Sequence, residues 1–219
     1  MRININVDLR VGRVVKYFIL VDLALLAGWG LIDPIFSIFI VNYVAGATLV
    51  TVGITTAMYW FLKSMLQMPF ANYLDRTSGE KDDFYALILG LFIVSFAAFS
   101  FTLVHEQWQL YVTQALKAVG FSLYAATWPA IFSRHLDKDR VSFDWAFDST
   151  AVSISAGAAG LMGSIIAKYW GFSSVFLFGG FFSLLSALVL VAVPDLILPP
   201  KTTTQNTGRE NRPPAEIVH

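Results

Sequence analysis

Six long apolar runs, separated by short polar or charged stretches, constrain the fold of this chain more than any other feature. Several runs reach the roughly 20 residues that a helix needs to cross the hydrocarbon core of a bilayer. With 56% hydrophobic and 14% charged residues, the chain is too apolar for an ordinary soluble domain. The alternating polarity of a transmembrane β-barrel does not persist anywhere in the sequence. The pattern therefore predicts an all-α integral membrane protein with six transmembrane helices.

The apolar runs divide the chain into three parts. Residues 1–16 form a basic N-terminal segment, residues 17–194 hold the six spans, and residues 195–219 form a polar tail that we expect to be disordered. The first run is longer than a signal-peptide core and lacks a small-residue cleavage site, so it is predicted to be a retained span. The spans are expected at about residues 17–41, 48–70, 85–104, 108–132, 145–167 and 172–193.

Two charged stretches, residues 71–84 and 133–144, are predicted to be short aqueous loops between spans. Twelve basic residues lie in these loops, the N-terminal segment and the tail, whereas only Lys168 lies in a connection on the other side. By the positive-inside rule, both termini and both charged loops are predicted to be cytoplasmic, in a multi-pass protein of the plasma (inner) membrane.

Composition argues against several other classes of protein. Fifteen basic and fifteen acidic residues balance, and no basic cluster is interleaved with aromatic residues, so no nucleic-acid partner is predicted. The chain has no cysteine, and none of its three histidines has a helical partner ligand. We therefore predict no metal site and no cofactor.

Four ionisable side chains lie well inside the predicted spans: Asp22, Asp33, Lys63 and Lys117. A charge near the middle of a membrane is costly unless it is paired or hydrated. At about 1.5 Å per residue, Asp33 and Lys117 lie roughly 12 and 14 Å from the outer ends of their helices, which predicts one pair at a shared depth. Asp22 and Lys63 form a second candidate pair nearer the cytoplasm. These residues either line a cavity that binds a solute or exchanges a proton, or they clamp helices together.

Two aromatic residues of the fourth span, Tyr124 and Trp128, are further candidates for the lining of a solute pathway. They lie four residues apart, and Lys117 precedes the first of them by about two helical turns. The alternative is that they are lipid-facing or interfacial anchors.

Glycine and proline recur at similar depths in the first and fourth spans, as Gly28 and Gly120 and as Pro34 and Pro129. The recurrence predicts two three-helix units. Because the first and fourth spans run in opposite directions, the units would be inverted repeats, as in secondary transporters. Chance recurrence is the alternative, since both residue types are common in membrane helices.

The loop after the second span reads L-D-R-T-S-G-E-K at residues 74–81. With six spans, it resembles half of a transporter of the major facilitator superfamily, in particular bacterial members, whose loop here reads G-x-x-x-D-R-x-G-R-K. Asp75 and Arg76 match directly, and Gly79 and Lys81 are each displaced by one residue. The sequence departs from the pattern with Ala71 at the first glycine and Glu80 at an arginine.

The resemblance implies a secondary-active transporter of a small solute that works by alternating access between two six-helix bundles. The second bundle would come from another copy of the chain, giving a homodimer, or from a different chain. The resemblance also implies a cytoplasmic gate at Asp75, for which we predict pairing with Arg134 or capping of the next helical turn. Coupling to a proton or to sodium is left open.

Three alternatives remain at this point. The first is a non-transporting six-helix membrane scaffold or assembly protein in which the buried charges are structural. The second is an integral-membrane enzyme, for which the sequence offers no nucleophile, paired carboxylates or metal ligands. The third is a fragment of a longer transporter.

Overall fold

The computed structural model describes residues 12–76, 80–136 and 138–194. The predicted tail, most of the N-terminal segment and Gly79 therefore lie outside the described residues. The described chain forms six long helices: α1 (Arg13–Tyr43), α2 (Leu49–Arg76), α3 (Glu80–Ser100), α4 (Gln107–Arg134), α5 (Val141–Trp170) and α6 (Phe172–Val191), with a short 3₁₀ turn, η1 (Phe101–Leu103), after α3.

Each predicted span overlaps one of these helices, which confirms the all-α fold. The helices extend beyond the spans, because α2 continues to Arg76 and α3 begins at Glu80. Most of the stretch predicted as a fourteen-residue loop, residues 71–84, is therefore helical. The acidic residues that suggested a loop occupy the first turn of α3, where the helix dipole favours negative charge.

Five of the described helices are long and apolar enough to cross a membrane, and α4 is the exception. It has 28 residues, as α2 has, but its buried residues include Gln114, Lys117 and Thr127. α4 packs against α2 and α3, so these polar side chains lie inside the protein. A helix whose polar residues face protein can span a membrane at a lower mean hydropathy.

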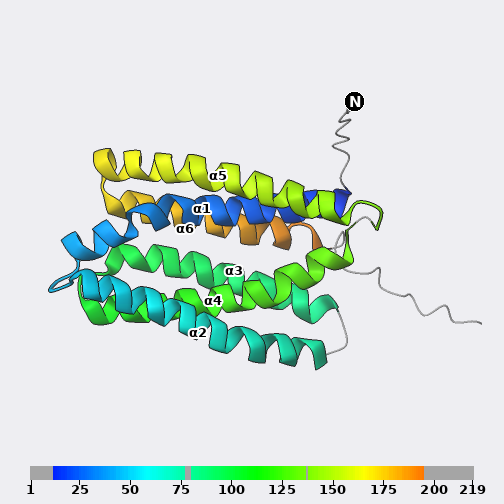
Figure 1. Cartoon of the computed structure of the whole chain (residues 1–219), viewed down its shortest axis with the longest axis horizontal. Helices are drawn as coiled ribbons and strands as arrows, with labels where there is room; N and C mark the ends of the chain where they lie inside the picture. The colour runs from blue at the N-terminus through cyan, green and yellow to red at the C-terminus, as the bar shows by residue number, and fades with distance from the viewer. Residues whose placement is uncertain (1–11, 77–79, 137, 195–219) are drawn as a thin grey trace, which may run out of the picture.

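The helices lie side by side in two layers, with α1, α5 and α6 in one layer and α2, α3 and α4 in the other (Figure 1). α1 packs against α5 and α6, α4 packs against α2 and α3, and α3 contacts α6 across the layers. If α1, α2 and α3 are exchanged with α4, α5 and α6 in that order, the same set of main contacts results: α1–α5 becomes α4–α2, α1–α6 becomes α4–α3, and α3–α6 is unchanged. This is the arrangement that two inverted three-helix units produce.

The glycines that suggested the repeat have equivalent packing roles. A Cβ atom on Gly28 of α1 would lie 2.6 Å from the carbonyl oxygen of Gly179 in α6. A Cβ atom on Gly120 of α4 would lie 2.9 Å from the carbonyl oxygen of Gly90 in α3. α1 thus approaches α6, and α4 approaches α3, through a pair of glycines, because small residues allow close contact between backbones.

The two ends of the bundle differ in charge. Arg13 at the start of α1, Arg76 at the end of α2 and Arg134 at the end of α4 lie at one end, which we call the basic end. At the opposite end the amide of Ala45 donates a hydrogen bond of 2.8 Å to the carbonyl oxygen of His105, which joins the α1–α2 connection to the α3–α4 connection.

Candidate translocation site

Charged and aromatic side chains of α1 and α4 meet along the seam between the two layers. Lys117 Nζ of α4 lies 3.3 Å from Asp33 Oδ1 of α1, so the first predicted ion pair forms. The two side chains differ in environment, because that of Lys117 is 10% exposed and that of Asp33 is 63% exposed. The pair therefore has a buried cation and an accessible anion.

Aromatic rings surround the ammonium group of Lys117. Its Nζ lies 3.9 Å from the ring centroid of Trp29 and 4.8 Å from that of Tyr59. Phe121, one turn after Lys117, lies edge-on to Trp29 with ring centroids 5.4 Å apart. Cation–π attraction of this kind stabilises an ammonium group away from water.

The second predicted pair, Asp22 with Lys63, does not form. Asp22 is buried and accepts a hydrogen bond from the hydroxyl of Tyr124 in α4. Lys63 instead lies over the ring of Trp60, with Nζ 5.1 Å from its centroid. The prediction failed because equal depth does not bring two side chains together: Asp22 meets Tyr124 of α4, whereas α2, which carries Lys63, packs mainly on α4.

Asp148 of α5 is a buried carboxylate that the sequence reasoning missed. It is 6% exposed, and its Oδ1 atom has no hydrogen-bond partner. It lies at the start of the predicted fifth span, residues 145–167. However, α5 begins at Val141, seven residues earlier, so Asp148 lies roughly 11 Å inside the helix.

Four buried polar atoms in the described chain have no hydrogen-bond partner, and all belong to α1, α4 and α5: Trp29 Nε1, Gln114 Oε1, Trp128 Nε1 and Asp148 Oδ1. Buried polar atoms in proteins are normally paired with protein or water. Trp128 is buried and packs against the half-buried Tyr124, with ring centroids 6.0 Å apart. These unpaired atoms offer hydrogen bonds to water or to a polar solute.

The residues predicted to form a gate lie at the basic end. Asp75, Arg76 and Lys81 are exposed at the end of α2 and the start of α3. Arg134 Nη1 donates a hydrogen bond of 2.7 Å to Asp83 Oδ2 in the first turn of α3. In the structure Arg134 therefore pairs with Asp83, which lies eight residues after the predicted partner Asp75.

A family profile described as Major Facilitator Superfamily matches residues 18–218. The chain belongs to the major facilitator superfamily. Comparisons with curated proteins and with solved structures gave no significant match. The general activity of this superfamily member is therefore membrane transport. Within the described residues, no group of three or more His, Asp or Glu side chains could hold a metal ion.

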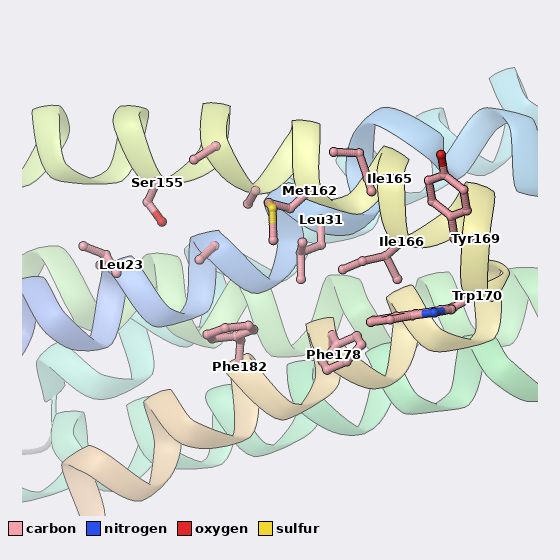
Figure 2. A pocket seen from close by; sticks show the side chains of 13 residues that line it. Leu23, Leu31, Ser155, Met162, Ile165, Ile166, Tyr169, Trp170, Phe178 and Phe182 are labelled. Carbon is pink, nitrogen blue, oxygen red and sulfur yellow. The ribbon is translucent and has the colours of Figure 1, made fainter.

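This superfamily protein also has an apolar groove of about 770 Å³ between α1, α5 and α6. Figure 2 shows Leu23, Met162 and Phe182 among the side chains that line it. The lining contains no charged residue, so the groove suits hydrocarbon and differs in chemistry from the α1–α4 seam.

Proposed function

We propose that this chain is a secondary-active transporter that moves a small polar or amphipathic solute along the α1–α4 seam by alternating access. Its pathway residues are Asp33, Lys117, Tyr124 and Trp128, with Asp22 deeper toward the basic end. In this proposal the described six helices form one half of the working transporter.

The exposed carboxylate of Asp33 carries the proposal. Its side chain is 63% exposed although it lies roughly 15 Å from the nearer end of α1. A carboxylate at this depth is strongly disfavoured in lipid, and intramembrane charges generally face a bundle interior or a water-filled cavity. The face of α1 that carries Asp33 therefore suits a hydrated pathway rather than the bilayer.

A second bundle would enclose this pathway. In the most apolar windows of α2 and α5 only 11% of the residues are buried, against 44% in α3 and α6. α2 packs on α4 and α5 packs on α1, so the two least buried helices flank the seam. A second copy of the chain, related by twofold symmetry, would cover both helices and close the pathway between the two seams.

The charge distribution supports a cytoplasmic location for the basic end. Arg13, Arg76, Arg134 and Arg140 lie at or beside helix ends there, whereas Lys168 is the basic residue in the last turn of α5 at the opposite end. By the positive-inside rule the N-terminus is then cytoplasmic. Since α6 ends at the basic end, the C-terminal tail would begin on the same side.

The main alternative is a non-transporting scaffold in which Asp33 and Lys117 only hold α1 against α4. Two observations favour transport over this alternative. An ion pair that only holds two helices together is screened least by solvent and salt when both partners are buried, whereas Asp33 is mostly exposed. In addition, the unpaired polar atoms Gln114 Oε1 and Trp128 Nε1 would weaken a purely structural interior.

Uptake by the purified full-length protein in liposomes tests the proposal. The panel would hold isotope-labelled amino acids, sugars, nucleosides, organic acids and quaternary amines, each with a proton or sodium gradient. We expect uptake of at least one solute class, and its loss in Asp33→Asn and Lys117→Ala but not in Asp82→Asn, which changes an exposed carboxylate outside the seam. No uptake in any condition, with the seam variants altering stability alone, would favour the scaffold.

A further inference from the structure

We propose that the solute recognised at the seam is an organic cation, and that the ammonium group of Lys117 competes with it for the carboxylate of Asp33. The inference rests on the proposed function, because it names the class of solute that the transport site takes. It can be tested by binding alone, so its outcome does not depend on a measurable rate of transport.

The ion pair exposes its negative partner and shields its positive one. The side chain of Asp33 is 63% exposed, whereas that of Lys117 is 10% exposed. Among the described residues, Asp33 has one hydrogen-bond and ion-pair contact, in which Lys117 Nζ lies 3.3 Å from its Oδ1 atom. Its Oδ2 atom is left for another donor, since an ionised carboxylate accepts several hydrogen bonds. A solute that reaches the pair therefore meets a negative charge first.

The surroundings of Lys117 keep an anionic group away from its charge. The Nζ atom lies 3.9 Å from the ring centroid of Trp29, 4.8 Å from that of Tyr59 and 5.8 Å from that of Phe121. A solute carboxylate or phosphate would have to lose its water beside these apolar rings, which is costly. The lysine thus neutralises Asp33 when no solute is bound without offering a site to an anion.

Two aromatic rings beside the pair suit the apolar body of an organic cation. The ring centroids of Phe36 in α1 and Tyr59 in α2 lie 6.0 and 4.8 Å from Lys117 Nζ, and both residues are half-buried. Aromatic faces attract ammonium groups and also pack against hydrocarbon. An organic cation can use both the carboxylate and the rings, whereas an inorganic cation would use the carboxylate alone.

A second lysine, Lys63 of α2, is the group through which an anionic part of a solute would have to bind. It is half-buried, and its Nζ lies 5.1 Å from the ring centroid of Trp60. Lys63 lies fourteen residues from the start of α2, whereas Asp33 lies ten residues from the end of α1. Lys63 is therefore roughly 6 Å nearer to the basic end, and the experiment includes a variant of it.

Competition by Lys117 also provides a way to release the solute. The empty pair is neutral, and the pair with a bound cation carries one net positive charge. The ammonium group of Lys117 then repels the solute at short range, and the ion pair forms again when the solute leaves. Lys117→Gln should therefore bind the cation more tightly than the wild type but lose its uptake.

Equilibrium dialysis of isotope-labelled solutes against the full-length protein in phosphatidylcholine nanodiscs tests the class of solute. The solutes form two sets in which the body stays nearly constant and the charge changes. The first set is phenethylamine, phenylalanine, phenylethanol and hydrocinnamate. The second set is choline, glycine betaine and their uncharged and anionic tert-butyl analogues. We expect the cation of at least one set to bind more tightly than the zwitterion, the neutral solute and the anion of that set.

Variants of the pair separate competition from a structural role. We expect Asp33→Asn to weaken binding of the cation about fivefold or more, and Lys117→Gln to strengthen it by a similar factor. A merely structural pair would move both variants in the same direction. Asp82→Asn, which changes an exposed carboxylate outside the seam, should leave binding unchanged. If Asp33→Asn does not fold, Asp33→Asn combined with Lys117→Gln leaves no buried charge unpaired and should still bind the cation weakly.

Three results would overturn the proposal: an anion or zwitterion that binds as tightly as the cation of its set, weaker binding of the cation by Lys117→Gln, or no binding of any solute. Binding of an anion that is lost in Lys63→Gln would overturn it by assigning the site to an anionic group. Uptake in liposomes keeps the two proposals distinct. Binding of the cation without uptake would count against transport alone, whereas uptake of only an anion or a zwitterion would support transport and overturn the assignment of the solute.

Discussion

Lys117 and Asp33 form an ion pair of 3.3 Å in which the lysine is buried and the aspartate is mostly exposed. The rings of Trp29 and Tyr59 hold the ammonium group in place. Only the carboxylate side of the pair is open to solvent or solute. We infer that the pair opens by displacement of Asp33 while Lys117 stays in its aromatic surroundings.

Replacing Asp33 with Asn should therefore destabilise the bundle, because the buried Lys117 ammonium loses its counter-charge. Removing both charges in Asp33→Asn with Lys117→Gln should restore part of the loss. Because Asp33 is exposed, we expect a coupling free energy of about 1 kcal/mol rather than the larger value typical of fully buried pairs. Reversible unfolding in mixed detergent micelles, followed by tryptophan fluorescence, measures this double-mutant cycle. Additive effects of the two substitutions would contradict the pairing.

The contact between Arg134 and Asp83 should stabilise the basic end of the bundle. The hydrogen bond of 2.7 Å joins the last turn of α4 to the first turn of α3, and Asp83 is buried. Replacing Asp83 with Ala leaves the guanidinium without this acceptor, and a charge-assisted hydrogen bond is worth about 1.5–3 kcal/mol. Unfolding free energies should fall by an amount in this range.

Asp82→Ala is the matched control, because Asp82 lies in the same helical turn and is exposed. Its effect should stay within about 0.5 kcal/mol. Equal destabilisation by the two variants would mean that the helix dipole, rather than the contact with Arg134, accounts for the effect.

The sequence was sufficient for the number of helices and for the depth of single residues. Depth follows from the rise of 1.5 Å per residue, and it correctly placed Asp33 level with Lys117. It did not tell which helices are neighbours. Asp22 meets Tyr124 of α4, whereas Lys63 lies over the ring of Trp60 in its own helix.

Helix ends were the second source of error. Charged residues were counted as loops, whereas the first turns of α3 and α5 accommodate acidic residues such as Asp83 and Asp144. Because α5 begins at Val141 and not at about residue 145, Asp148 lies well inside the helix, where it is buried. α5 is apolar on most sides, so its sequence shows no polar face that would reveal where Asp148 points. The burial of this carboxylate follows from the packing of α5 in the bundle, which the sequence does not show.

Glycines of α5 should differ sharply in their tolerance of alanine. A Cβ on Gly163 would lie 2.1 Å from the Leu31 carbonyl oxygen, whereas nothing lies within 4 Å of one on Gly157. Gly163→Ala must push α5 away from α1, and such overpacking typically costs about 1–3 kcal/mol. Gly157→Ala should be neutral or should stabilise the helix by up to about 1 kcal/mol. Thermal unfolding of both variants in the same detergent makes the comparison, and equal effects would contradict the close α1–α5 packing.

Cross-linking can test the proposed second bundle, because the chain has no cysteine and each introduced thiol is unique. Twofold pairing of two seams places α2 of one copy against α5 of the other, since these helices flank the seam on opposite sides. Met65 on α2 and Ile154 on α5 are exposed, and each lies sixteen residues, or roughly 24 Å, from the end of its helix that is opposite the basic end. Membranes that contain both Met65→Cys and Ile154→Cys chains should therefore give an oxidised heterodimer.

Leu89→Cys serves as the control partner for Met65→Cys. Leu89 is 54% exposed on α3, away from the seam, and lies at a similar depth in the bundle. Pairing through the seam predicts little cross-linking between Met65→Cys and Leu89→Cys, whereas random collision in the membrane would give similar yields for both mixtures. If neither mixture cross-links, a second copy of this chain does not cover α2 and α5. The proposed second bundle would then have to come from a different chain.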